Sequence, residues 1–150
     1  MSQSYLLDTN VLLALIRGNA LGKHIDQAFG LKASLQRHAV SIVTQAELWV
    51  LADTHGWGPA KRAVLEEAVE NLVVIPIDGI DLVQAYGRIS SASRTAPSGS
   101  INMGKNDIWI AATALYTNMP LLTTDKDFRF LHNNPLQVMW IDPGSAQTVH

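Results

Sequence analysis

The sequence predicts a three-layer α/β/α domain built around a central parallel sheet. Short apolar runs that fit buried strands alternate with longer segments in which apolar residues recur at helical spacing. The chain has 150 residues, of which 47% are hydrophobic and only 16% are charged, a composition that favours a compact, well-packed fold. We therefore expect residues 1–150 to form a single domain without a linker.

Each predicted strand is a short apolar run that ends at polar or turn-forming residues. The predicted strands are Tyr5–Leu7, Val40–Val43, Val73–Ile77, Leu121–Thr123 and Val138–Trp140. A helical pattern, rather than a tight hairpin turn, follows each of the first four runs. Because a helical crossover joins parallel neighbours, we expect a parallel sheet with helices on both faces.

Each predicted helix combines helical spacing with a start or stop signal. Gly18 and Asn19 end the first helix, the capping-box pattern from Thr44 to Glu47 starts the third, and Pro59 suits the first position of the fourth. The predicted helices are Val11–Ile16, Leu21 to about Arg37, a helix containing Leu48–Ala52, Pro59–Leu72, Asp81 to about Arg94, Ile108–Tyr116 and a short helix through Phe130. Most of Ser90–Lys105, which is rich in Ser, Gly and Asn, is predicted to be a mobile loop.

The composition also excludes several classes of protein. There is no cysteine, which excludes disulfides, thiolate zinc sites and cysteine nucleophiles. No secretory signal pattern and no apolar run of about 18 residues is present, so we expect a cytoplasmic protein that does not contact a membrane. The net charge of −2 counts against binding nucleic acid by charge alone, unless a cation neutralises acids gathered at one site.

Four acids fall at one edge of the predicted sheet, where strands end and helices begin. Asp8 and Asp125 follow strands, whereas Glu47 and Asp107 lie in the first turns of helices. Each has a structural explanation by itself, as a cap, a turn residue or a partner of the helix dipole. Together they would repel, by roughly 4 kcal/mol for two carboxylates about 4 Å apart at an effective dielectric of 20. Such a cluster needs protons or a cation, and its hard oxygen ligands favour Mg²⁺ or Mn²⁺.

Four ordered strings around these acids resemble the signature motifs of PIN domains, particularly those of VapC-type toxins. The strings are Leu6-Leu7-Asp8-Thr9-Asn10, Ser41-x-x-Thr44-x-x-Glu47-Leu48, Gly104-Lys105-Asn106-Asp107-x-x-Ile110-Ala111-Ala112-x-Ala114 and Leu122-Thr123-Thr124-Asp125-Lys126-Asp127-Phe128. The resemblance implies a PIN-like fold and endonucleolytic RNA cleavage that depends on one or two Mg²⁺ or Mn²⁺ ions. It also implies a homodimer bound by a cognate antitoxin.

The resemblance assigns roles to individual residues. Asp8, Glu47 and Asp107 match the three core acids, Asp125 matches a more variable fourth, and Asp127 is an auxiliary metal ligand. The auxiliary polar residues are Asn10, Thr44 and Thr123. Asn10 is alternatively a helix cap, and Asn106 is read as a cap rather than a ligand. The candidate RNA-binding residues are Arg17, Arg94, Lys105, Lys126 and Arg129, for each of which ordinary surface charge is the alternative; Ser98, Ser100 and Asn102 are weaker candidates.

The implied reaction is in-line attack of a metal-activated water on a phosphodiester, which leaves a 5′-phosphate and a 3′-hydroxyl. A haloacid-dehalogenase phosphatase would need a second acid two positions after Asp8, where this chain has Asn10. A non-catalytic RNA-binding or interaction module on the same fold remains the alternative, although no core acid is lost. Trp49 and Trp57 suit a dimer interface or the core equally well, and Trp109 suits core or dimer packing.

Overall fold

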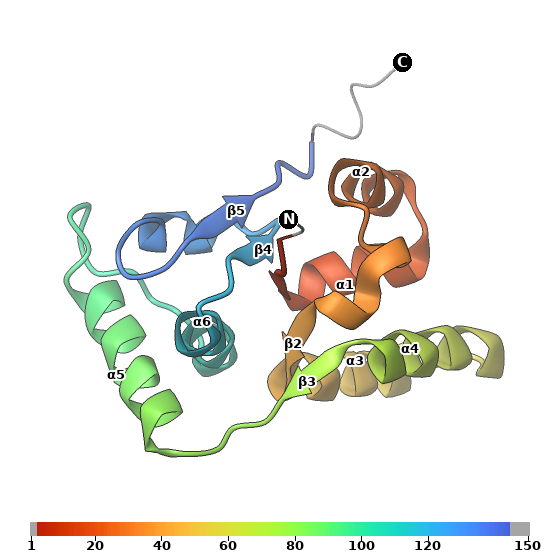
Figure 1. Ribbon diagram of the computed structural model, residues 1–150, viewed down its shortest axis with the longest axis horizontal. Helices are drawn as coiled ribbons and strands as arrows, with labels where there is room; N and C mark the ends of the chain where they lie inside the picture. The colour runs from red at the N-terminus through yellow and green to blue at the C-terminus, as the bar shows by residue number, and fades with distance from the viewer. Residues whose placement is uncertain (1–2, 145–150) are drawn as a thin grey trace.

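The computed structural model describes residues 3–144 and contains one five-stranded sheet (Figure 1). Its strands are β1 (Leu6–Leu7), β2 (Ala39–Ser41), β3 (Val73–Ile75), β4 (Leu121–Thr123) and β5 (Val138–Trp140). They are ordered β3-β2-β1-β4-β5, and every neighbouring pair is parallel. The predicted three-layer fold with a parallel sheet is therefore confirmed. The connections run away from β1 in opposite directions, so the boundary between β1 and β4 is the switch point at which such folds bind ligands.

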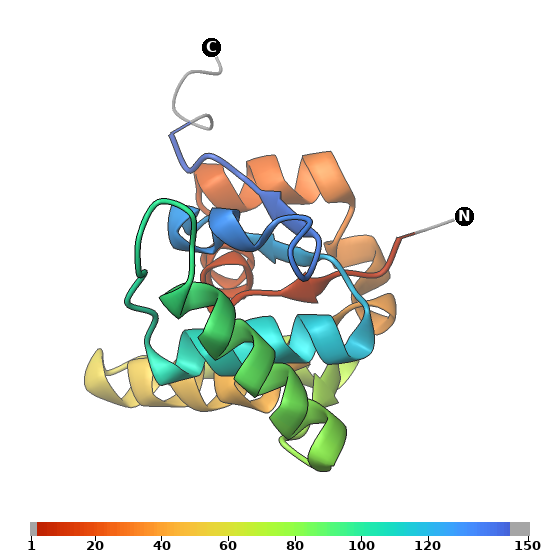
Figure 2. The same cartoon turned by 90° about the vertical axis from the view of Figure 1, so that its left-hand side faces the viewer.

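Helices cover both faces of this sheet. The helices are α1 (Thr9–Arg17), α2 (Ala20–Phe29), α3 (Ile42–Thr54), α4 (Pro59–Asn71), α5 (Ile80–Arg94) and α6 (Lys105–Thr117), and the 3₁₀ segments are η1 (Lys32–Arg37) and η2 (Lys126–Leu131). Figure 1 shows α5 and α6 on one side of the sheet and α1, α2 and α4 on the other. In Figure 2, α5 crosses over α6, and the loop that joins them lies at the end where α6 begins.

The two apolar cores follow from the alternation of side chains along the strands. Leu6 and Leu121 pack with α5, α6 and η2, whereas Leu7, Val40 and Leu122 pack with α1, α3 and α4. All five are fully buried, and each such aliphatic side chain contributes about 2 kcal/mol of hydrophobic stabilisation. No helix of residues 3–144 is long and apolar enough to cross a membrane.

The turn between α1 and α2 brings their backbones into close contact. Gly18 ends α1 in the left-handed conformation (φ 61°), and its N–H donates to the carbonyl oxygen of Ala14 at 3.0 Å. A Cβ atom at Gly22 would overlap the same oxygen. Only glycine therefore allows α2 to pack this closely on α1.

The helix predicted from Leu21 to Arg37 is wrong, because the chain forms two separate elements there. Gly30 ends α2 with φ 61° and donates its N–H to the carbonyl oxygen of Asp26 at 2.7 Å. The chain then continues as η1. A left-handed glycine cannot continue an α-helix, which explains the break.

The predicted start of the third helix is also wrong, whereas the predicted end of the fifth helix is confirmed. Ser41 caps α3 by accepting the N–H of Val43, so the helix begins before Thr44 and Glu47 lies in its second turn rather than in a capping box. Residues 90–94, where the predicted helix and the predicted loop overlap, belong to α5. The hydroxyl of Ser93 is satisfied there by the carbonyl oxygen of Ser90 within the helix.

Candidate active site

Asp8 lies at the carboxyl end of the central strand β1 and caps α1. One carboxylate oxygen, Oδ1, accepts the N–H of Thr9 at 2.8 Å, and the other accepts the hydroxyl of Thr123 at 2.7 Å. The residue is only 3% exposed. The pKa of Asp8 is raised to about 6, mainly by burial and also by the charges of Asp107 and Asp125, while the two hydrogen bonds oppose the rise.

Glu47 projects from α3 towards the same edge and is held by two hydroxyl groups. The hydroxyl of Thr9 donates to Oε1 of Glu47 at 2.7 Å, so the hydroxyl of Thr44, 2.9 Å away, donates to Thr9. On the other side, Nδ2 of Asn106 lies 3.5 Å from Oε2 of Glu47. Thr9 therefore connects the first and third helices next to the acids.

Asp107 and Asp125 complete the predicted group of four. Asp107 lies half-buried in the first turn of α6, and its pKa is raised by burial, followed by the charges of Asp125, Glu47 and Asp127. Asp125 caps η2 by accepting the N–H of Asp127 at 2.9 Å. Its own N–H donates at 3.0 Å to the Thr123 hydroxyl that also binds Asp8. The acids thus share one electrostatic environment, as the sequence predicts.

The oxygen ligands at this edge fit a hard divalent cation. Within residues 3–144, no three acidic or histidine side chains converge closely enough to enclose an ion by themselves. Mg²⁺ does not require such a cage, because it usually keeps several waters and takes only one or two protein carboxylates together with substrate phosphate oxygens. The raised pKa values of Asp8 and Asp107 indicate negative charge that a cation would stabilise.

The predicted auxiliary polar residues have different surroundings. Thr44 and Thr123 are fully buried beside the acids. Asn10 is exposed in α1 and does not cap the helix, since Asp8 does. Asn106 does not cap α6 either, because Gly104 occupies that position and frees the Asn106 amide to approach Glu47.

Four of the five predicted RNA-binding residues are close in sequence to the edge of the sheet that carries the four acids. Lys105 begins α6, Lys126 and Arg129 lie in η2, and Arg94 ends α5 where the loop to α6 starts. Arg17 differs, because it lies at the far end of α1. At a rise of about 1.5 Å per residue, the length of α1 separates it from Asp8 by roughly 13 Å. Its placement in the site is not supported.

The tryptophans considered for a dimer interface pack into the protein. Trp57 is 8% exposed within one apolar core, and Trp49 packs against that core. Trp109 packs against the other core and contacts Tyr86 with ring centroids 4.3 Å apart. The core explanation therefore accounts for these side chains.

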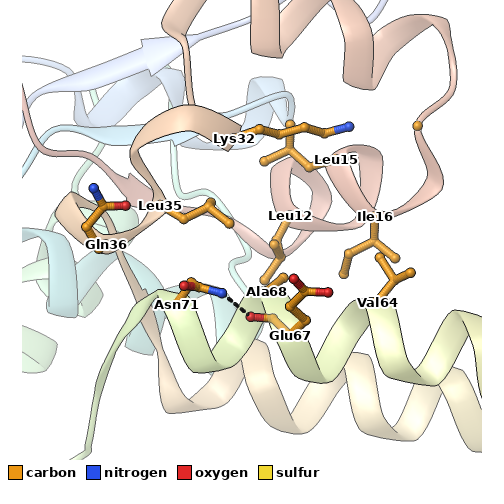
Figure 3. A pocket seen from close by; sticks show the side chains of 11 residues that line it. Leu12, Leu15, Ile16, Lys32, Leu35, Gln36, Val64, Glu67, Ala68 and Asn71 are labelled. Carbon is orange, nitrogen blue, oxygen red and sulfur yellow. Dashed lines mark hydrogen bonds between the residues drawn. The ribbon is translucent and has the colours of Figure 1, made fainter.

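A separate apolar groove lies away from the acids (Figure 3). It has a volume of about 390 Å³ and runs between α1, η1 and α4. Leu12, Leu15 and Ile16 of α1 face Val64 and Ala68 of α4 across it. Because its lining contains none of the four acids, this groove is distinct from the candidate active site.

Comparison with known proteins identifies related chains over most of this length. A family model described as PIN domain matches residues 5–132. The ribonuclease VapC5 of Mycobacterium tuberculosis is 33% identical over 128 residues, covering 84% of this chain and 86% of the relative. PIN-domain ribonucleases of the VapC kind generally depend on a divalent metal ion.

Solved structures have the same fold. The VapBC-5 toxin–antitoxin structure from Mycobacterium tuberculosis contains a chain 27% identical, with a TM-score of 0.59, covering 92% of this chain and 97% of that one. In VapBC2 from Rickettsia felis, bound to a DNA fragment from its promoter, the matching chain is 23% identical, with a TM-score of 0.73 and coverage of 93% and 100%.

Proposed function

We propose, since this chain belongs to the PIN-domain family, that it is a divalent-metal-dependent endoribonuclease and the toxin of a toxin–antitoxin pair. The observation that carries the proposal is the carboxylate of Asp8 at the switch point of the sheet. It is 3% exposed, yet the charges of Asp107 and Asp125 act on it. A buried acid beside other acids is stabilised in its charged form by a bound cation.

The acids Asp8, Glu47, Asp107 and Asp125 would hold one or two Mg²⁺ or Mn²⁺ ions, with Asp127 as an auxiliary ligand. When bound, the ion acidifies a water and neutralises the scissile phosphate. The chain itself positions the ligands: Thr123 and the Thr9 N–H hold the two oxygens of Asp8, and the Thr9 hydroxyl holds Glu47. In-line attack by water then expels the 3′ oxygen and leaves a 5′-phosphate.

RNA would be bound by basic side chains near the acids. Lys105, Lys126, Arg94 and Arg129 are all exposed and come from three elements that end or begin near this edge. Their charges offset the repulsion that a net charge of −2 imposes on a polyanion.

A cleavage assay tests this function directly. The parent protein should cut RNA with Mg²⁺ or Mn²⁺ and not in excess EDTA, and Asp107→Asn should abolish cutting. Asp78→Asn, which alters an exposed acid in the turn before α5, is the matched control and should cut like the parent. An active Asp107→Asn protein, or parent cleavage that persists in EDTA, would contradict the proposal.

The proposed partner is an antitoxin, in keeping with the toxin–antitoxin complexes among the similar structures. The groove between α1, η1 and α4 supplies an apolar surface that a helix of such a partner would bury. In this groove Val64 is 46% exposed, whereas Val50 on α3 is 64% exposed and lies outside it. Val64→Glu should weaken capture of the proposed antitoxin, the protein encoded next to the gene for this chain, and should leave RNA cleavage intact. Val50→Glu should change neither, and equal capture by both variants would rule out the groove.

We also propose that the protein is a homodimer. The buried Trp57 no longer argues for this, so the proposal depends on the family alone. Light scattering at several concentrations tests it, and a monomer mass throughout would reject it.

A further inference from the structure

Trp140 differs from the other three tryptophans of the chain. Trp49, Trp57 and Trp109 pack against one or other apolar core, whereas Trp140 is part of neither core as far as residues 3–144 define them. It is only partly buried, at the end of β5. Its contacts at the strand end therefore differ from those of the three tryptophans that pack against the cores.

The ring of Trp140 is fixed beside the candidate active site. Trp140 pairs with Thr123, so the two side chains point to the same face of the sheet. Its indole N–H donates to the carbonyl oxygen of Thr124 at 3.1 Å. Thr124 lies directly between Thr123, which binds Asp8, and the acid Asp125.

Arg129 lies over this ring. Its guanidinium carbon is 4.4 Å from the ring centroid, a distance typical of cation–π stacking. Arg129 is exposed, and the single ion pair formed by residues 3–144 joins Arg62 to Asp53 instead. Because none of the carboxylates of residues 3–144 pairs with it, the exposed guanidinium of Arg129 is available to a ligand while the indole holds it in place.

A second cation–π pair, formed by Lys61 and Trp57, lacks the features that would let the pair of Arg129 and Trp140 bind a base. Lys61 lies over Trp57 at 4.1 Å, but Trp57 is 8% exposed and belongs to the core. An ammonium group also has no flat face on which a base can stack. The pair of Arg129 and Trp140 combines a planar cation, a fixed ring and a position at the edge of the sheet where Asp8 and Asp125 lie.

We propose that Arg129, supported by Trp140, is a stacking platform for one unpaired base of the RNA next to the scissile phosphate. The inference rests on the proposed ribonuclease function and adds a preference for single-stranded substrate, because a base within a duplex has no free face. Bases of single-stranded RNA stack on guanidinium planes and aromatic rings.

The test combines one protein variant with one change in the substrate. Once a cleavage site is mapped on a single-stranded RNA, abasic nucleotides are placed in turn at positions flanking it, and kcat and KM are measured. Arg129→Lys keeps the positive charge and removes the planar face. With intact RNA it should raise KM about tenfold and leave kcat nearly unchanged, because only substrate binding is weakened. Arg17→Lys, the same change at the far end of α1, should behave like the parent.

The substrate change distinguishes stacking from phosphate binding. At one flanking position the abasic RNA should raise KM for the parent about tenfold and have little effect on Arg129→Lys, because the two changes remove the same contact. If Arg129→Lys matches the parent while Arg129→Ala raises KM and flattens the salt dependence, Arg129 binds phosphate and the platform is refuted. Equal effects of every abasic position on parent and variant also refute it. A parent that cleaves no RNA would instead overturn the proposed function itself.

Discussion

Replacing Asp8 by asparagine is expected to stabilise the metal-free protein while abolishing RNA cleavage. The pKa of Asp8 rises from 3.8 to about 6 on folding, so at pH 7 the charged carboxylate costs the folded state about 3 kcal/mol. The amide of Asp8→Asn carries no charge and still accepts the N–H of Thr9. Losing the hydrogen bond from Thr123 costs about 1 kcal/mol, which leaves a net gain of about 2 kcal/mol.

The gain should depend on pH with a definite sign. Because the folded pKa of Asp8 is raised, the parent takes up its proton as the pH falls through about 6, and the folded state then loses its penalty. The parent and Asp8→Asn should therefore differ most at pH 7 and converge near pH 4. For a chain of 150 residues, about 2 kcal/mol raises Tm by about 4–8 °C at pH 7.

Thermal melts in EDTA and in Mg²⁺, paired with a cleavage assay on the same samples, measure both effects. Asp78→Asn is again the control, with an expected change within about 0.5 kcal/mol at its exposed position. Added Mg²⁺ should raise the Tm of the parent more than that of Asp8→Asn. A destabilised Asp8→Asn protein in EDTA, or one that still cuts RNA, would refute the reasoning.

Three further predictions concern the site and the packing around it. RNA cleavage at a constant, subsaturating metal concentration should fall as the pH drops through about 6, because protonated Asp8 is a poor ligand; a flat profile from pH 7 to pH 5 would contradict this. Thr9→Val should weaken Mg²⁺ binding about tenfold in a metal titration, since it removes the 2.7 Å hydrogen bond to Glu47, and Thr9→Ser should restore it. Gly22→Ala should lower the free energy of unfolding in urea by about 1–3 kcal/mol through overlap with the α1 backbone, whereas Gly87→Ala, with open space around it, should not destabilise the protein.

The sheet could be predicted from the sequence because each strand is a short apolar run, and the three central strands are buried on both faces. Leu121–Thr123 and Val138–Trp140 have the same bounds in the prediction and in the structure. Helix boundaries were harder, since several polar residues compete to form a cap. Ser41 and Thr44 are both good caps, and the choice between them depends on where β2 ends in the sheet.

The positions of the four acids could also be predicted, because each follows a strand or lies near the start of a helix. Thr9 was missed as a residue that holds Glu47, although it lies between two residues of the first motif. Its hydroxyl bonds residues 35 and 38 positions away, and local patterns contain no information on such partners. The contact of Arg129 with Trp140 could not be predicted from local patterns either, because it joins η2 to β5 through the tertiary fold.

The pairing of β1 with β4 means that the edge carrying the acids can assemble only late in synthesis of the chain. Asp8 leaves the ribosome early, but the hydroxyl that orients it belongs to Thr123, 115 residues later, in a strand that must pair directly beside β1. Parallel pairing over such a separation forms only after the intervening chain has been made. A product that stops before Leu121 carries three of the four acids without an assembled edge to hold them. Unfinished copies of the chain are therefore expected to be inactive as nucleases.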